Sequence, residues 1–183
     1  MNNLPKKYPV PSKILANQSI SFSEYEKLYK LSIENPNIFW FEQSKTLDWI
    51  ETPKVVGESD FTDGAKISWF KDGKINASAN CLDRHLSAIP EKVAIILEGD
   101  DPSEVLKITY KELYEKVCQL SNALIEIGVK KGDRITIYLP MIPEAAISML
   151  ACSRIGAIHS VVFGGFSPES LKNRIQDCDS SYI

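Results

Sequence analysis

Apolar segments of strand length alternate with helical segments in the second half of the chain, and this order constrains the fold more than any other feature. Short apolar runs lie at 106–110, 133–140 and 158–163, and residues 180–183 begin another. Helical patterns fill the intervals between them. A strand–helix–strand order favours parallel strands joined by right-handed crossovers. The sequence therefore predicts an α/β protein with a layered, mostly parallel sheet in this half.

Capping signals mark the ends of these helices. Thr109 and Glu112 form a capping-box pattern before the helix at 110–128, which Gly128 ends. Its apolar stripe recurs at helical spacing over four turns and comprises Leu113, Val117, Leu120, Leu124 and Ile127. Pro143 suits the first turn of the next helix, and Ser167 before Pro168 suits the start of the last one.

The first 90 residues do not follow the alternation and predict a helical and hairpin arm. Prolines predict an extended lead up to about residue 20. A capping box from Ser21 or from Ser23 starts a helix in 21–35. The remaining expected elements are a helix at 37–50, a hairpin at 66–78 turning at Asp72-Gly73, and a helix at 80–89 capped by Asn80.

The sequence pattern changes at residues 92–99, which form a continuous apolar run. Such a run is typical of a strand covered on both faces. We therefore divide the chain into an arm at 1–89 and the first, incomplete part of a larger domain at 90–183. Asp83, Arg84 and His85 form a charged cluster without the spacing of a nucleophile site. We expect them to form salt bridges between segments.

Composition excludes several classes of function. The chain is 44% hydrophobic and 25% charged with a net charge of −3, so it has no basic field for nucleic acid. No stretch approaches the roughly 18 apolar residues of a membrane helix, and the N-terminus is not a secretory signal. The four widely spaced cysteines show no metal or redox pattern. Reduced thiols and a cytoplasmic location are the expectation.

The stretch "HSVVFGGFSPESLKNRI" at 159–175 is the candidate binding segment. Gly164 and Gly165 follow an apolar strand, at the edge where open α/β sheets bind ligands, and a helix N-terminus follows them. The segment matches neither the dinucleotide-binding motif GxGxxG nor the P-loop motif GxxxxGK[ST]. The first basic residue after the glycines is Lys172. Residue chemistry therefore leaves two interpretations open, an anion site or a tight turn that needs small residues.

Three separated segments, in order, resemble the AMP-forming acetyl-coenzyme A synthetases of the adenylate-forming superfamily. They are "NPNIFWFEQSKTLDW", "ISWFKDGKINASANCLDRHL" and the run from "GVKKGDRITIYLP" through "VVFGGFSPESL". The resemblance covers the chain from about residue 20 to its end. It implies that acetate attacks ATP to give acetyl-adenylate and pyrophosphate, with Mg²⁺ assisting, and that CoA then displaces AMP.

The same resemblance implies that Phe163, Gly164 and Gly165 lie against the nucleotide end of CoA. The family's phosphate loop, acetate pocket and catalytic lysine are absent from these 183 residues. We therefore expect an N-terminal portion that is inactive alone, binds none of ATP, CoA or Mg²⁺ tightly, and self-associates through unpaired edges.

The sequence admits two other interpretations and disfavours a third. One is a non-catalytic α/β module that binds a nucleotide or a partner, and another is part of a propionyl-CoA synthetase, which shares the "GGFS" neighbourhood. A Rossmann-type dehydrogenase is disfavoured because the GxGxxG pattern and its ribose-binding acid are missing.

Overall fold

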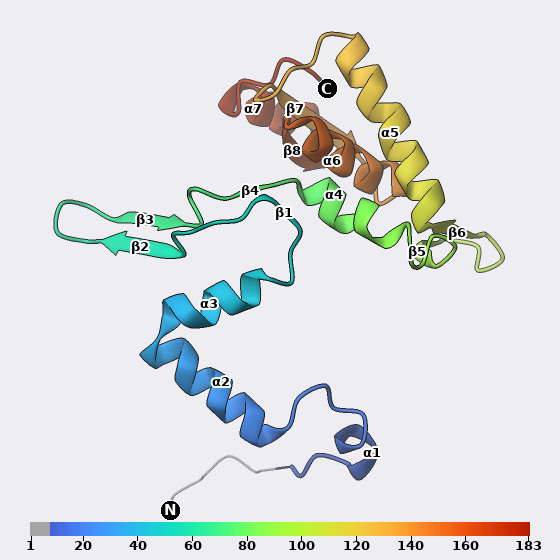
Figure 1. Ribbon diagram of the computed structural model, residues 1–183. Helices are drawn as coiled ribbons and strands as arrows, with labels where there is room; N and C mark the ends of the chain where they lie inside the picture. The colour runs from blue at the N-terminus through green and yellow to red at the C-terminus, as the bar shows by residue number, and fades with distance from the viewer. Residues whose placement is uncertain (1–7) are drawn as a thin grey trace, which may run out of the picture. The chain divides into compact units, whose positions relative to one another are not determined.

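The computed structural model describes residues 8–183 and shows a mixed α/β chain (Figure 1). Two compact units form within it. Unit 1 comprises the described residues up to Thr46 together with Pro53–Lys71, and unit 2 comprises Leu47–Thr52 together with Asp72–Ile183. The α/β class expected from the sequence is confirmed, and each unit is described by itself below.

Three helices form the first part of unit 1: α1 Ser12–Leu15, α2 Phe22–Glu34 and α3 Pro36–Ser44. The Ser21 capping box is confirmed, because the Ser21 hydroxyl accepts from the Glu24 amide and the Glu24 carboxylate accepts from the Ser21 amide. The short helix α1 lies where the sequence predicted an extended lead, whose first seven residues fall outside the described range.

A hairpin completes unit 1, and its position corrects the sequence prediction. Strand β2 (Gly57–Asp60) pairs antiparallel with β3 (Lys66–Trp69). The predicted hairpin at 66–78 is wrong, because β3 pairs backwards with β2 and not forwards across Asp72-Gly73. The Trp69 ring explains the choice: it lies over Gly57, where a Cβ would approach it to 3.0 Å, and it meets Trp40 edge-on at 6.0 Å.

A second antiparallel pair, in unit 2, corrects the predicted helix at 37–50. Strand β1 (Trp49–Glu51) pairs with β4 (Lys74–Ile75), and the Lys74 ammonium lies 2.6 Å from the Glu51 carboxylate. The helix therefore ends at Ser44. A pairing partner more than twenty residues away decides this local conformation, and helix periodicity carries no information about it.

The next helix begins earlier than predicted. Helix α4 (Ala77–Cys81) is capped by Asn76, whose side-chain oxygen accepts from the Ala79 amide, and a 3₁₀ turn η1 follows at Asp83–His85. Asn80 was predicted as the cap, which is wrong. The side-chain oxygen of Asn80 instead accepts from the Asp48 N–H, and its side-chain nitrogen donates to the Asp48 carbonyl. Asn80 therefore fastens the β1 segment to α4.

Strands β5 (Val93–Glu98) and β6 (Val105–Thr109) form a separate antiparallel hairpin. The expectation that 92–99 is covered on both faces is wrong, because Ile96 is 64% exposed and Val93 is also exposed. The expectation that the strand at 106–110 joins the parallel sheet is also wrong, since β6 pairs only with β5 among the described strands.

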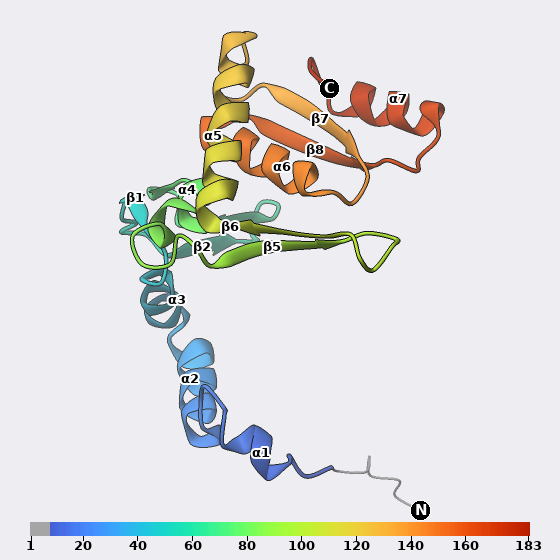
Figure 2. The ribbon, with the colours of Figure 1, turned by 90° about the vertical axis from the view of Figure 1, so that its right-hand side faces the viewer.

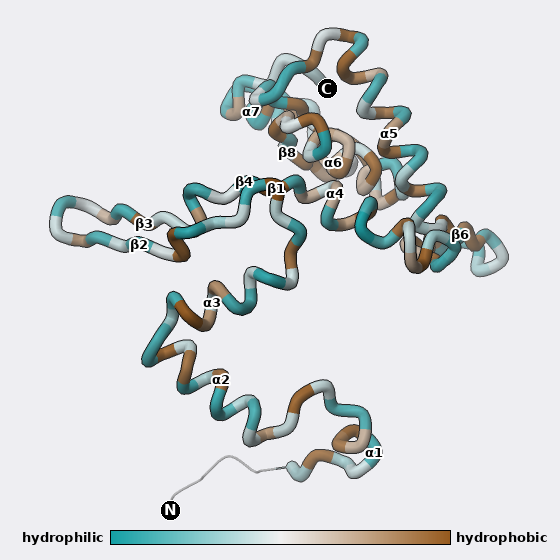
Figure 3. The backbone as a smooth tube through the Cα atoms, in the orientation of Figure 1, coloured by the Kyte–Doolittle hydropathy of each residue, from teal (hydrophilic) through white to brown (hydrophobic). Residues whose placement is uncertain are grey.

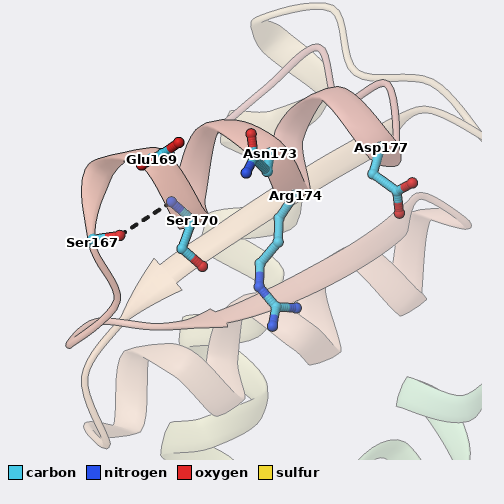
Figure 4. A pocket seen from close by; sticks show the side chains of 6 residues that line it. All are labelled: Ser167, Glu169, Ser170, Asn173, Arg174 and Asp177. Carbon is cyan, nitrogen blue, oxygen red and sulfur yellow. Dashed lines mark hydrogen bonds between the residues drawn. The ribbon is translucent and has the colours of Figure 1, made fainter.

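The parallel part of the fold follows. Helix α5 (Tyr110–Glu126), strand β7 (Arg134–Leu139), helix α6 (Pro143–Ile155), strand β8 (Ile158–Phe163) and helix α7 (Pro168–Asp177) occur in the predicted order. Strands β7 and β8 are parallel, and Tyr182 makes a parallel bridge to Ile135. Helix α6 lies along one face of the β7–β8 pair and α7 along the opposite face (Figures 2 and 4).

Two apolar clusters hold unit 2 together. Leu82, Leu113, Val117 and Ile147 lie in the first, and Ile135, Ile137 and Cys152 lie in the second. Figure 3 shows hydrophobic residues along α6 and β8 and a mainly hydrophilic α7. The predicted stripe of α5 is buried at Leu113 and Val117, half-buried against the clusters at Leu120 and Leu124, and exposed at Ile127. Helix α5 is thus amphipathic as predicted, with a shorter buried face.

Candidate functional site

The predicted site residues lie together where β8 ends. Phe163 is the last residue of β8, Gly164 and Gly165 follow it, and α7 begins at Pro168. This is the carboxyl end of the parallel pair, as the sequence predicted. Phe163 is 54% exposed, which leaves part of the residue available for contact.

Contacts within the protein explain why each of the two positions requires a glycine. A Cβ on Gly164 would come within 3.1 Å of the Pro140 nitrogen and 3.2 Å of the Leu139 carbonyl carbon. A Cβ on Gly165 would come within 2.7 Å of the Phe163 ring. Neither glycine has a positive φ. The glycines are therefore needed for close packing, which allows the loop to lie on the β7–α6 connection and the Phe163 ring to lie on the loop.

An apolar hollow of about 410 Å³ opens beside the Phe163 ring. Its lining comes from the β7–α6 connection, the first turns of α6, strand β8 and the loop that follows it. The lining residues are Leu139, Pro140, Met141, Ile142, Ala145, Ala146, Met149, Val161, Phe163, Phe166 and Arg174. All belong to unit 2. A mostly apolar hollow bordered by two aromatic rings suits a ligand that has a flat apolar part.

Phe166 and Arg174 are the site residues that sequence reasoning missed. The Phe166 ring meets the Phe163 ring edge-on at 6.1 Å, and the Arg174 guanidinium lies over the Phe166 ring at 4.9 Å from its centroid. The Tyr138 hydroxyl donates to the Phe166 carbonyl at 2.9 Å. Lys172, the first basic residue after the glycines, is exposed and does not line the hollow. The sequence signal that could have predicted Arg174 is its spacing of two helical turns from the Ser167 cap.

A second, polar hollow lies along α7 (Figure 4). The Ser167 hydroxyl accepts from the Ser170 amide at 3.3 Å, so the predicted cap is confirmed. Glu169 and Asp177 line this hollow together with Arg174. Two carboxylates beside one guanidinium oppose a phosphate, so we do not place an anionic ligand there.

The charged cluster at 83–85 lies at the other end of α6. Arg154, in the last turn of α6, pairs with Asp83, and its guanidinium lies 5.0 Å from the centroid of the Tyr114 ring. A hydrogen bond with the Cys118 side chain is the main cause that raises the pKa of Tyr114. The part of α6 that lines the hollow ends at Met149, and neither Arg154 nor Asp83 is among the lining residues. The predicted intersegment salt bridges are confirmed, and they are structural.

Among residues 8–183, no three His, Cys, Asp or Glu side chains converge in a way that could hold a metal ion. Within the same range, every helix is too short or too polar to cross a membrane.

Two family models match the chain in succession. Residues 25–81 match the acetyl-coenzyme A synthetase N-terminus, and residues 82–183 match the AMP-binding enzyme family. Acetyl-coenzyme A synthetase from Rhizobium rhizogenes is 53% identical over 97% of this chain, and the Bradyrhizobium sp. (strain ORS 278) protein of the same name is 51% identical over 97%. The alignments cover 27% and 28% of those relatives, so the chain spans about a quarter of their length.

A solved structure gives the same fold. Acetoacetyl-CoA synthetase from Streptomyces lividans superposes with a TM-score of 0.75 over 92% of this chain and 26% of that chain, at 24% sequence identity. The fold and the two matches thus define an enzyme class that binds AMP. The chain belongs to the AMP-binding enzyme family, and its first part is of the acetyl-coenzyme A synthetase type.

Proposed function

We propose that this chain is the N-terminal part of an AMP-forming acetate–CoA ligase. Such a ligase converts acetate, ATP and CoA into acetyl-CoA, AMP and pyrophosphate through acetyl-adenylate. The observation that carries the proposal is the identity of 53% over 97% of the chain to a relative named acetyl-coenzyme A synthetase, of which the chain spans 27%. The names of these relatives also favour acetate over propionate.

The role we assign to this part of the ligase is one wall of the CoA site. Phe163, Gly164 and Gly165 would lie against the nucleotide end of CoA. The support is geometric: Phe163 is half exposed, and its ring borders an apolar hollow that a flat base fits. The division into an arm at 1–89 and the start of the large domain at 90–183 is part of the same proposal.

ATP, CoA and Mg²⁺ are the cofactors of the proposed reaction, and small molecules are its only proposed partners. When bound with ATP, Mg²⁺ neutralises phosphate charge during adenylation. We assign no residue of this chain to the metal or to the ATP phosphates. What these residues do is shape the surface for CoA. A cytoplasmic location belongs to the proposal, and the four free thiols agree with a reducing compartment.

The test separates the two half-reactions. The full-length protein should catalyse acetate-dependent ATP–pyrophosphate exchange without CoA, and should release AMP when CoA is added. Propionate should support exchange with a lower kcat/KM than acetate. The 183-residue chain alone should do neither. Exchange by the isolated chain would overturn its assignment as a part, and a full-length protein that prefers propionate would overturn the choice of substrate.

A further inference from the structure

We propose that Arg174 is a positioning residue for the CoA wall and acts through Phe166 on Phe163. The inference rests on the proposed function, because it concerns the same site. Arg174 itself need not touch the ligand. Its role would be to keep the Phe166 ring in place, so that the Phe163 ring stays over Gly165 and beside the hollow.

The first support is a continuous chain of contacts. The guanidinium of Arg174 lies 4.9 Å from the centroid of the Phe166 ring, and that ring meets Phe163 edge-on at 6.1 Å. Cation–π and edge-to-face contacts both depend on orientation, so each fixes the direction of a ring as well as its position. The Phe166 backbone is held separately, by the Tyr138 hydroxyl and by its own amide donating to the Phe163 carbonyl.

The second support is a contact that Arg174 does not make. Asp177 lies three residues further along α7, at the spacing of a helical ion pair, and Glu169 lines the same polar hollow. Among residues 8–183, neither carboxylate lies within ion-pair distance of the guanidinium. Figure 4 shows the Arg174 side chain directed away from Asp177 and towards the strands. The guanidinium thus lies on the aromatic ring although a carboxylate is near in sequence.

The third support is that little besides Phe166 restrains the Phe163 ring. On one side its ring occupies the space beside Gly165, where a Cβ would be 2.7 Å away, and on another side it borders the open hollow. A ring that is 54% exposed has few neighbours to hold it. Phe166 is the aromatic neighbour that restricts it, and Arg174 restricts Phe166.

The test uses a double-mutant cycle in the full-length protein. Arg174→Met keeps the apolar stem and removes the charge. It should raise KM for CoA about two- to fivefold, the factor that an exposed cation–π contact carries, and leave acetate-dependent ATP–pyrophosphate exchange unchanged. Arg174→Lys should restore part of the loss. Lys172→Met, which removes one positive charge from the exposed face of the same helix, is the matched control and should change neither quantity.

The cycle distinguishes positioning from direct contact. Phe166→Leu should raise KM for CoA by itself, and adding Arg174→Met to it should cause little further change. Additive effects would mean that Arg174 meets CoA without Phe166 and would overturn the proposal. An unchanged KM in Arg174→Met, or equal losses in both half-reactions, would also overturn it. If Arg174→Met does not fold, Arg174→Gln takes its place in the cycle.

Failure of this inference is separable from failure of the proposed function. Gly165→Val displaces the Phe163 ring directly. If Gly165→Val raises KM for CoA and Arg174→Met does not, only the role of Arg174 is wrong. If neither variant changes KM for CoA, the CoA wall itself is wrong.

Discussion

Arg154 in the last turn of α6 holds Asp83 of η1 through two parallel hydrogen bonds of 2.8 Å each. The pair is the type of bidentate contact in which an arginine fork matches both carboxylate oxygens. It fastens a segment at residue 83 to a helix that ends more than seventy residues later. Its hydrogen bonds are the main cause that lowers the pKa of Asp83 and raises that of Arg154.

Asp83→Asn should destabilise unit 2 by about 1 kcal/mol, because the side chain is partly exposed and solvent screens the pair. A loss of this size lowers Tm by roughly 3 °C in a chain of this length. The lowered pKa means that the pair stabilises the fold above the ordinary carboxyl value of about 4 and that this is lost as pH falls through the folded pKa. Urea unfolding of both proteins from pH 7 to 3 checks the prediction.

Asp63→Asn is the matched control for Asp83→Asn, because Asp63 is almost fully exposed and lies 3.7 Å from Lys66. It should leave stability unchanged at neutral pH. The two proteins that differ at position 83 should converge in stability as pH falls through the folded pKa of Asp83. An equal loss in both variants at pH 7 would contradict a specific role for the Arg154 pair.

Asn76 connects two helix ends. Its side-chain oxygen caps α4, and its amide donates to the carbonyls of Ser153 and Arg154 at 3.3 and 3.0 Å. Asn76→Ala removes both functions and should cost about 2 kcal/mol, whereas Asn76→Ser keeps the capping oxygen and should cost about 1 kcal/mol. Chemical denaturation of the three proteins measures the difference. Full recovery in the serine variant would show that the contact with α6 contributes nothing.

Gly165→Val should raise the CoA requirement of the full-length ligase without impairing adenylation. Its Cβ would come within 2.7 Å of the Phe163 ring and force that ring to move. KM for CoA and acetate-dependent ATP–pyrophosphate exchange are the two measurements. Lys172→Val, which places the same residue at an exposed position of α7, serves as the control. Equal loss of both half-reactions would count against a CoA role for the loop.

The isolated 183-residue chain should self-associate. Tyr182 bridges to β7 at Ile135, and no described strand continues along that edge, beside which lies an apolar hollow of about 350 Å³ lined by Leu120, Leu124 and Ile183. Open sheet edges with apolar surroundings promote pairing between chains. Sedimentation at several concentrations should show a mass above 20.5 kDa.

Two variants locate the surface that drives this association. Ile183→Lys places a charge at the open edge and should weaken association, whereas Ile96→Lys on the β5–β6 hairpin should not. A concentration-independent monomer of the unsubstituted chain would refute the prediction, and a stronger effect at Ile96 would move the contact to the hairpin.

Local signals in the sequence determined the elements that depend on near neighbours. The capping boxes at Ser21 and Thr109 and the Ser167 cap are formed as predicted, since each needs only residues three positions apart. The parallel β7–β8 pair followed from the strand–helix–strand order. Phe163, Gly164 and Gly165 lie together for the simple reason that they are consecutive in the chain.

The tertiary structure alone decided what depends on distant partners. Trp49 lies in a strand because Ile75 pairs with it, Asn80 binds Asp48 instead of capping, and β6 pairs with β5 instead of joining β7. The contacts of Arg174 and Phe166 require both the turn after β8 and the rotation of α7. Pairing and ring packing are set by residues far apart in sequence, so periodicity and capping rules could not predict them.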